Sequence, residues 1–305
     1  MSAGCGTRPD DQPRSSAWRS VLLVALFAAG WAFVETSIGR RVRGEYDLLQ
    51  IVWSRYAVHL LLVLVIWGRR DPLGLWRTQR PGFHLARSLM MLIMPWSFAT
   101  SLQSGLSASG TWLLFWSSPL LIILLGRLFC RESPAWWSWV LAVVTWGGVA
   151  MIVGGSLPVL EARLLLPGLM AVSFSAYVVM TRSLRDEPLR VNMVYTATAV
   201  FVLLSLRMPF VWVMPSMHDA VLFAGIGSFG LLALLALDRA VAGSALWVVA
   251  PGLAIQAAME PGLSVLESGQ IPGGHALAGM LLLGICLLLA GALPSRRPVL
   301  MASAG

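Results

Sequence analysis

The stretch "SASGTWLLFWSSPLLIILLGRLFCRESPAWWSWVLAVVTWGGVAMIVG" (residues 107–154) holds two apolar runs, which are divided by the charged segment "GRLFCRES". Each run has about 20 residues, the length at which a helix that rises ~1.5 Å per residue crosses the ~30 Å hydrocarbon core of a bilayer. The stretch therefore predicts two consecutive membrane-spanning helices joined by a short charged connection.

The composition of the whole chain extends this pattern. Of its 305 residues, 57% are hydrophobic and only 12% are charged, whereas a soluble domain carries roughly a quarter charged residues. Ten apolar runs are predicted to span the membrane, at residues 20–38, 49–67, 83–103, 107–126, 135–154, 163–181, 191–206, 219–237, 243–265 and 274–293. We therefore expect an all-α polytopic membrane protein with ten transmembrane helices and short tails at residues 1–19 and 294–305.

The basic residues are unevenly distributed between the two sets of connections. All 22 of them are arginines, and they give the chain a net charge of +8. With the N-terminus inside, fifteen arginines fall in cytoplasmic segments and five in the opposite ones, and cytoplasmic loops are the ones that retain positive charge. We expect a multi-pass protein of the cytoplasmic (inner) membrane with both tails cytoplasmic, whose partner is the lipid bilayer and not nucleic acid.

The chain also repeats itself at an offset of 135 residues. The offset becomes 137 after Glu267, because the segment "SGQIPGG" (268–274) contains two extra residues. The matched residues are Glu132 with Glu267, Gly147 with Gly284 and Gly154 with Gly291. A five-helix repeat at residues 20–154 is thus predicted to be followed by a second at 163–293, the alternative being a chance match of Leu- and Gly-rich segments. Because five is odd, the second copy is inverted, an arrangement typical of secondary transporters that bind substrate near the midplane.

These residues resemble the EamA-type members of the drug/metabolite transporter superfamily over nearly the whole chain. The resemblance rests on "WSRYAVHLL" (53–61), similar to an Arg-aromatic motif of the second helix, and on the proline, glutamate and glycines of residues 107–154. The second copy, "AGSALWVVAPGLAIQAAMEPGLSVLESG" (242–269), departs from the pattern, because the proline expected at Ala254 is Pro251 and because Glu260 and Pro261 lie within the span. The resemblance implies transport of small organic metabolites.

Four charged side chains fall inside the predicted helices and away from their end residues: Glu35, Arg55, Arg87 and Glu260. An ionised group at a helix centre costs ~2.5–3.5 kcal/mol on insertion scales, so each needs a partner, a wet cavity or the membrane interface. Arg87 is expected to reach the interface as a structural anchor. Glu35 and Arg55 approach the same outer end. They either form a structural ion pair or line a cavity for an anionic or zwitterionic substrate, with His59 on the helical face of Arg55.

Prolines and aromatic residues provide further candidates for a substrate cavity. Pro119 and Pro251 lie near the middle of their spans, where a released carbonyl is tolerated only against protein or water. They are interpreted as bends that line a cavity, the alternative being packing kinks. The aromatic candidates, which could equally be packing residues, are Trp96, Trp112, Trp116 and Trp247, with Trp31 and Tyr177 on the first helices of the two halves.

Glu260 is the candidate for proton or cation coupling. Pro261 cannot donate a backbone hydrogen bond and so frees a carbonyl one turn back, which leaves unpaired polar groups beside the carboxyl. The alternative is that the ninth helix ends near Met259 and Glu260 faces outer water.

Glu132 and Glu267 are interpreted as structural residues. Each is expected just before the following helix, where a carboxylate accepts free amide hydrogens at the positive end of the helix dipole. Gly147, Gly154, Gly284 and Gly291 are expected to give the fifth and tenth helices close-packing faces, as a scaffold or as a homodimer surface.

Taken with the resemblance, these patterns predict a secondary transporter that moves a small-molecule substrate by alternating access, without ATP, cofactor or metal. The chain has no P-loop, and its four histidines are scattered without an HExxH motif. The match "GIGSFG" (225–230) lacks the strand and βαβ unit of a nucleotide site. An enzyme is therefore not expected, and the alternative function is a ligand-sensing or scaffold protein on the same fold.

Overall fold

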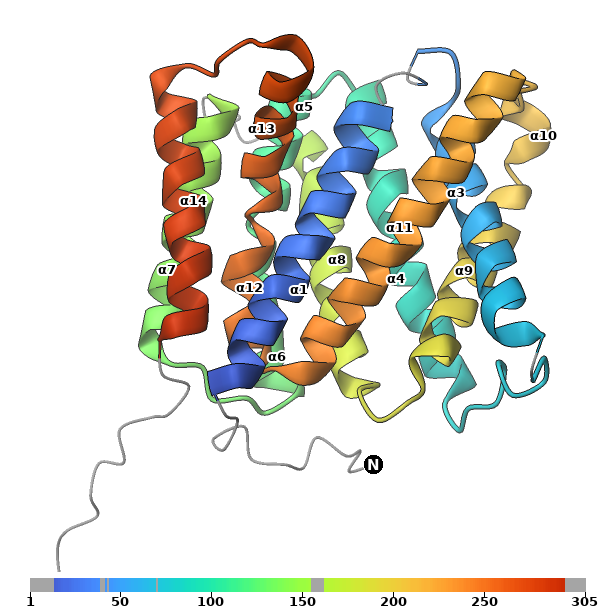
Figure 1. Cartoon of the computed structure of the whole chain (residues 1–305), viewed down its shortest axis with the longest axis horizontal. Coiled ribbons are helices and arrows are strands. Elements are labelled where there is room, and N and C mark those ends of the chain that lie inside the picture. Colours follow the sequence, from blue (N-terminus) through green and yellow to red (C-terminus); the bar gives the residue numbers. More distant parts are fainter. Residues whose placement is uncertain (1–13, 39–41, 43, 70, 155–161, 294–305) are drawn as a thin grey trace, which may run out of the picture.

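The computed structural model of the chain is a bundle of helices that run between two faces (Figure 1). It describes residues 14–38, 42, 44–69, 71–154 and 162–293. Within these ranges, nine helical segments are long and apolar enough to cross a membrane, and the helix Leu189–Ser205 is a shorter tenth. The predicted all-α polytopic fold is confirmed.

The helices follow one another in two sets of five spans. The first set comprises α1 (Arg14–Phe33) continued by η2 (Val34–Ile38), α3 (Leu48–Val63) continued by η3 (Leu64–Gly68), α4 (Pro81–Gln103), α5 (Ala108–Phe115) with α6 (Ser118–Phe129), and α7 (Trp136–Val153). The second set comprises η4 (Ala162–Leu164) with α8 (Leu165–Ser183), α9 (Leu189–Ser205) followed by the short α10 (Met208–Val211), α11 (Met217–Gly243), α12 (Leu246–Leu253) with α13 (Gln256–Ser268), and α14 (Gly274–Ala292).

The ends of the chain differ from the expectation in one respect. The helix α1 already begins at Arg14, so residues 14–19 belong to the first helix and not to the predicted tail. The remainder of that tail, the tail at 294–305 and the predicted outer arginines Arg40, Arg41 and Arg43 lie outside the described residues.

The two halves are inverted relative to each other. In Figure 1, α1 begins and α14 ends at one face, which also carries the α6–α7 connection and which we call the terminal face; the α13–α14 connection lies at the opposite face. The packing of the helices shows the same symmetry. The helix α1 packs on α11, and their counterparts in the other half, α8 and α4, pack on each other in the same way. The counterparts α7 and α14 also pack on each other. The inverted repeat is therefore confirmed.

The fourth span of each half is broken after eight residues, where α5 gives way to α6 and α12 to α13. Pro119 lies in the first turn of α6, whereas Pro251 lies inside α12, before its break. At the first break the Ser117 amide bonds to Leu114, and the Leu113 carbonyl instead accepts the indole N–H of Trp146 at 3.0 Å. A side chain of the next span thus satisfies the backbone group that the break releases.

The close approach of α7 and α14 rests on Gly148 and Gly279. A Cβ atom at Gly279 would lie 2.5 Å from the carbonyl oxygen of Gly148, so α14 could not carry a larger residue there without moving; a Cβ at Gly148 would lie 3.1 Å from the Leu283 side chain. Of the four glycines predicted to give close-packing faces, Gly291 packs against Trp18, Gly154 ends α7 at a φ of +63°, and Gly147 and Gly284 have open space beside them within the described chain. The α7–α14 contact therefore uses neither Gly147 nor Gly284, and a homodimer surface at these two glycines stays a prediction.

At the opposite face, the start of α3 is tied to the connection that leads into α11. The Tyr46 hydroxyl donates to the Asp219 carboxylate at 2.8 Å. The Gln50 side chain donates to the Val213 carbonyl at 2.6 Å and accepts from the Val213 amide at 3.0 Å. These bonds join the start of the second span of the first half to α11 of the second half and to the connection that precedes α11.

Candidate functional site

A cavity of about 600 Å³ lies on the side of the opposite face, between α5, the end of α7, α13 and the α13–α14 connection. Glu260 lines it together with Trp112 and Trp116. The helix α13 runs through Pro261 to Ser268. The alternative in which the ninth span ends near Met259 is therefore wrong, and Glu260 belongs to the wall of this cavity, which we call the outer cavity.

Two smaller cavities, each of about 40 Å³, share Arg55 and Glu35 as lining residues. We call them the arginine cavities. One of them extends to Trp31 and Trp112, and Trp112 also lines the outer cavity. The structure thus brings the two predicted charges to the same cavities, with the Trp112 side chain on the boundary toward the larger opening.

Arg55 is held by aromatic faces. Its guanidinium carbon lies 4.7 Å from the ring centroid of Trp31 and 4.7 Å from that of Tyr56, and its side chain is buried. Its Nε is a buried donor without a hydrogen-bond partner among the described residues. Gly230 of α11 admits this side chain, because a Cβ there would lie 3.1 Å from the Arg55 Cδ. A buried cation with a spare donor beside a cavity is suited to bind an anionic group.

Other predicted cavity residues lie elsewhere. His59 is buried and stacks on Tyr56 with ring centroids 5.7 Å apart. Trp247 is buried against Trp137 at 5.3 Å between centroids, whereas the Trp96 side chain is 47% exposed. None of the cavities described above is lined by these three predicted residues, nor by Pro119, Pro251 or Tyr177.

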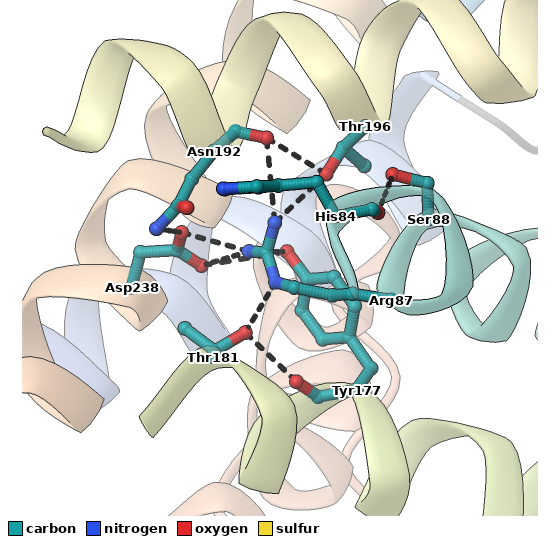
Figure 2. Close-up of polar contacts among 8 residues, drawn as sticks. All are labelled: His84, Arg87, Ser88, Tyr177, Thr181, Asn192, Thr196 and Asp238. Carbon is teal, nitrogen blue, oxygen red and sulfur yellow. Dashed lines mark hydrogen bonds and ion pairs between the residues drawn. The ribbon is translucent and has the colours of Figure 1, made fainter. Parts of the chain in front are cut away.

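Figure 2 shows a second charged cluster. It lies near the terminal face, because Arg87 is close to the start of α4 and Asp238 is close to the end of α11 (Figure 1). Arg87 of α4 and Asp238 of α11 form an ion pair at 2.8 Å, and their side chains are 0% and 1% exposed. The Arg87 guanidinium also lies 4.4 Å from the ring centroid of Tyr177 and donates to its hydroxyl at 2.8 Å. Arg87 therefore does not reach the membrane interface as expected but is fully buried.

Side chains of α8 and α9 complete this cluster. The Arg87 Nε donates to the Thr181 hydroxyl at 2.7 Å, and its Nη1 donates to the Thr196 hydroxyl at 3.0 Å (Figure 2). The Asn192 amide donates to Asp238 at 3.3 Å. A buried ion pair is stable only when such additional hydrogen bonds satisfy its remaining donors and acceptors. We call these six residues (Arg87, Tyr177, Thr181, Asn192, Thr196 and Asp238) the Arg87 cluster.

Glu132 forms another buried contact at the terminal face. Its carboxylate accepts the amide of Leu246, the first residue of α12, at 2.9 Å and lies 3.4 Å from the Nε of Arg182. Burial raises the pKa of Glu132, although Arg182 and the amide act in the opposite direction. Glu132 thus accepts amide hydrogens at a helix start as expected, but the helix is α12 rather than α7.

Glu267 does not share this setting. It is exposed and lies in the last turn of α13, seven residues before α14 begins at Gly274. The expectation that both glutamates stand just before the next helix is wrong for Glu267.

The bundle of two inverted halves, the two broken spans and the cavities beside the buried Arg55 define a multi-pass membrane protein built from inverted repeats. Residues 18–154 match the EamA-like transporter family. The resemblance to the EamA-type members of the drug/metabolite transporter superfamily is thereby confirmed.

Relatives of known description agree with this class. S-adenosylmethionine uptake transporters of Rickettsia bellii and Rickettsia conorii are 23% and 24% identical over 184 residues, which is 59% of this chain and 61% and 60% of theirs. The match thus spans less than two thirds of these relatives. A crystal structure whose title states no function aligns with a TM-score of 0.79 at 16% identity, over 92% of this chain and 98% of its own, and shows the fold alone.

Proposed function

We propose that the protein is a secondary transporter that moves a small organic solute across the cytoplasmic membrane by alternating access. The observation that carries the proposal is the asymmetry of the bundle: an outer cavity of about 600 Å³ on one side and a fully buried ion pair, Arg87 with Asp238, on the other. In an inverted-repeat transporter this is the arrangement of a state that faces one side of the membrane.

The solute is a zwitterion or an anion that enters through the outer cavity and places its negative group on Arg55. Support comes from the spare Nε donor of Arg55 and from Glu35 on the same cavities, which offers a counter-charge for an amino group. Trp31 and Trp112 supply aromatic faces for the remainder of the solute. S-adenosylmethionine, the solute named for the relatives, carries a carboxylate, an amino group and an aromatic base, and it is the first solute to assay.

Coupling to a proton or cation is assigned to Glu260. The carboxylate stands in the wall of the outer cavity, beside a proline within α13. A carboxylate that lines a transport cavity is a group on which a proton can be carried between the two sides. Both tails are placed in the cytoplasm, in agreement with the arginine distribution.

The test is uptake of labelled S-adenosylmethionine, then of a panel of amino acids and organic anions, into proteoliposomes with and without a pH gradient. The matched pair of variants is R55Q, which removes the cation from the arginine cavities, and W96F, which alters an exposed side chain outside them. Flux in the wild type and in W96F but not in R55Q is expected. Flux that is unchanged in R55Q would remove Arg55 from the site, and no flux of any solute would favour the sensor or scaffold function.

Coupling is tested with E260Q in the same vesicles. We expect the glutamine variant to retain exchange of solute across the membrane while a pH gradient no longer drives accumulation. Accumulation in E260Q that is driven as strongly as in the wild type would refute the assignment of Glu260.

A further inference from the structure

Two buried arginines of the first repeat, Arg55 on α3 and Arg87 on α4, each lie over an aromatic ring from the first span of a repeat. Arg55 lies over Trp31 of α1 and Arg87 lies over Tyr177 of α8, with guanidinium carbons 4.7 Å and 4.4 Å from the ring centroids. The helices α1 and α8 are the first spans of the two repeats, which are inverted. One buried arginine stacked on a first-span aromatic residue therefore lies toward the opposite face of the bundle, and the other lies toward the terminal face.

The surroundings of the two arginines differ. Arg55 borders cavities, whereas Arg87 is held by an ion pair to Asp238 of α11 and by hydrogen bonds that it donates to side chains of α8 and α9. Since α4 belongs to the first repeat, the Arg87 cluster fastens the two repeats to each other on the terminal side. On the other side, Arg55 borders two cavities of about 40 Å³ each.

The position of the ion pair relative to the central cavity is decisive. A cavity of about 10 Å³ at the core of the bundle is lined by Met91 and Leu234. Met91 lies one turn from Arg87 on α4, and Leu234 lies one turn from Asp238 on α11, in both cases on the side away from the terminal face. The ion pair is therefore the next layer below the floor of this cavity.

We propose that the Arg87–Asp238 pair is the gate of the terminal face: it links α4 to α11 through their side chains, and it must separate before the central cavity can open to that face. This inference rests on the proposed transport function and adds two residues to it. In the closed state each charge neutralises the other within an apolar bundle. When α4 and α11 part, both charges become accessible to water from the terminal face, which compensates the lost pairing.

The test measures access from the terminal face and needs no knowledge of the solute. In a chain whose three native cysteines are replaced by alanine, M91C places a reporter thiol in the wall of the central cavity. A membrane-impermeant maleimide is added to vesicles with the terminal face outward, sorted by a tag on the C-terminus. We expect slow labelling with the intact pair and labelling at least about tenfold faster in D238N, which removes the charge of the acceptor at nearly constant shape.

The matched control is D219N, which removes an aspartate from the same helix at its other end, where it accepts hydrogen bonds from Tyr46 and Ser216. Labelling in D219N is expected to equal that of the parent. If D238N does not fold, R87Q with D238N removes both charges and leaves none stranded, and it is expected to label as fast as D238N.

The outcomes separate the gate from the transport proposal. Labelling that is unchanged in every folded variant of the pair, with flux intact in the parent, overturns the gate alone. Labelling that responds to D238N and not to D219N supports the gate. Absence of flux in the parent overturns the transport function, whatever the labelling shows.

Discussion

Alanine at Gly279 is expected to destabilise the protein because it places a methyl group against backbone that cannot yield. The added Cβ would lie 2.5 Å from the Gly148 carbonyl oxygen and 2.9 Å from the Ile152 side chain. A carbon that contacts a carbonyl oxygen normally lies ~3.3–3.6 Å away, so α7 and α14 must part by roughly 1 Å. Overpacking of this kind costs ~1–3 kcal/mol, against which the better helix propensity of alanine returns ~0.5–1 kcal/mol.

Gly284 on the same helix provides the matched control, because a Cβ there meets nothing within 4 Å in the described chain. G284A should therefore gain only the propensity term of ~0.5–1 kcal/mol. The free energies of unfolding of the two variants are compared by SDS titration in mixed micelles, followed by tryptophan fluorescence. Their difference isolates the overpacking term of ~1–3 kcal/mol. Equal free energies for G279A and G284A would refute the assignment of the helix crossing to Gly148 and Gly279.

Three further perturbations test other parts of the structure. Burial raises the pKa of Glu132 above its ordinary 4.5, so the free energy of unfolding of the wild type relative to E132Q should fall as the pH rises through the raised pKa. Unfolding of both proteins in detergent from pH 4 to pH 8 measures this difference. A free-energy advantage of the wild type that grows with pH contradicts the reasoning. Y46F removes the hydrogen bond to Asp219 and should lower the free energy of unfolding by about 1 kcal/mol, measured by the same titration; no change would show that the bond is dispensable. W112A removes an aromatic face shared by the outer and arginine cavities and should raise the KM for transported solute by about two- to tenfold. W96A should leave the KM unchanged. Equal effects of the two variants would contradict a role of Trp112 in solute binding.

The spans and their inversion could be predicted from the sequence because they depend on local composition. Apolar runs of membrane-spanning length and the odd number of helices in each repeat determine both. The register of the repeat is less well determined, since leucine and glycine recur throughout such runs. Trp112 is the fifth residue of α5, whereas Trp247, which follows it at the repeat offset of 135 residues, is the second residue of α12. These two tryptophans therefore do not occupy matched positions.

The Arg87 cluster could not be predicted for a different reason. The apolar run in the sequence ends at Leu237, whereas α11 continues to Gly243 and carries Asp238 into the bundle. An aspartate is buried there only because an arginine 151 residues earlier in the chain meets it. A long-range partner of this kind leaves no local signal, whereas Glu35 and Arg55 lie close in the sequence and at the same end of their spans. Both line the same small cavities, which agrees with one of the two alternatives that the sequence offered for them.

The separation of Arg87 and Asp238 along the chain bears on how the protein is made. Translation at ~5–20 residues per second needs roughly 8–30 s to cover the 151 residues between them. Throughout that interval the nascent chain carries the Arg87 guanidinium while its partner, Asp238, has not yet been synthesised. Insertion of α4 must therefore be completed late, or the guanidinium must be kept hydrated until the eighth span arrives.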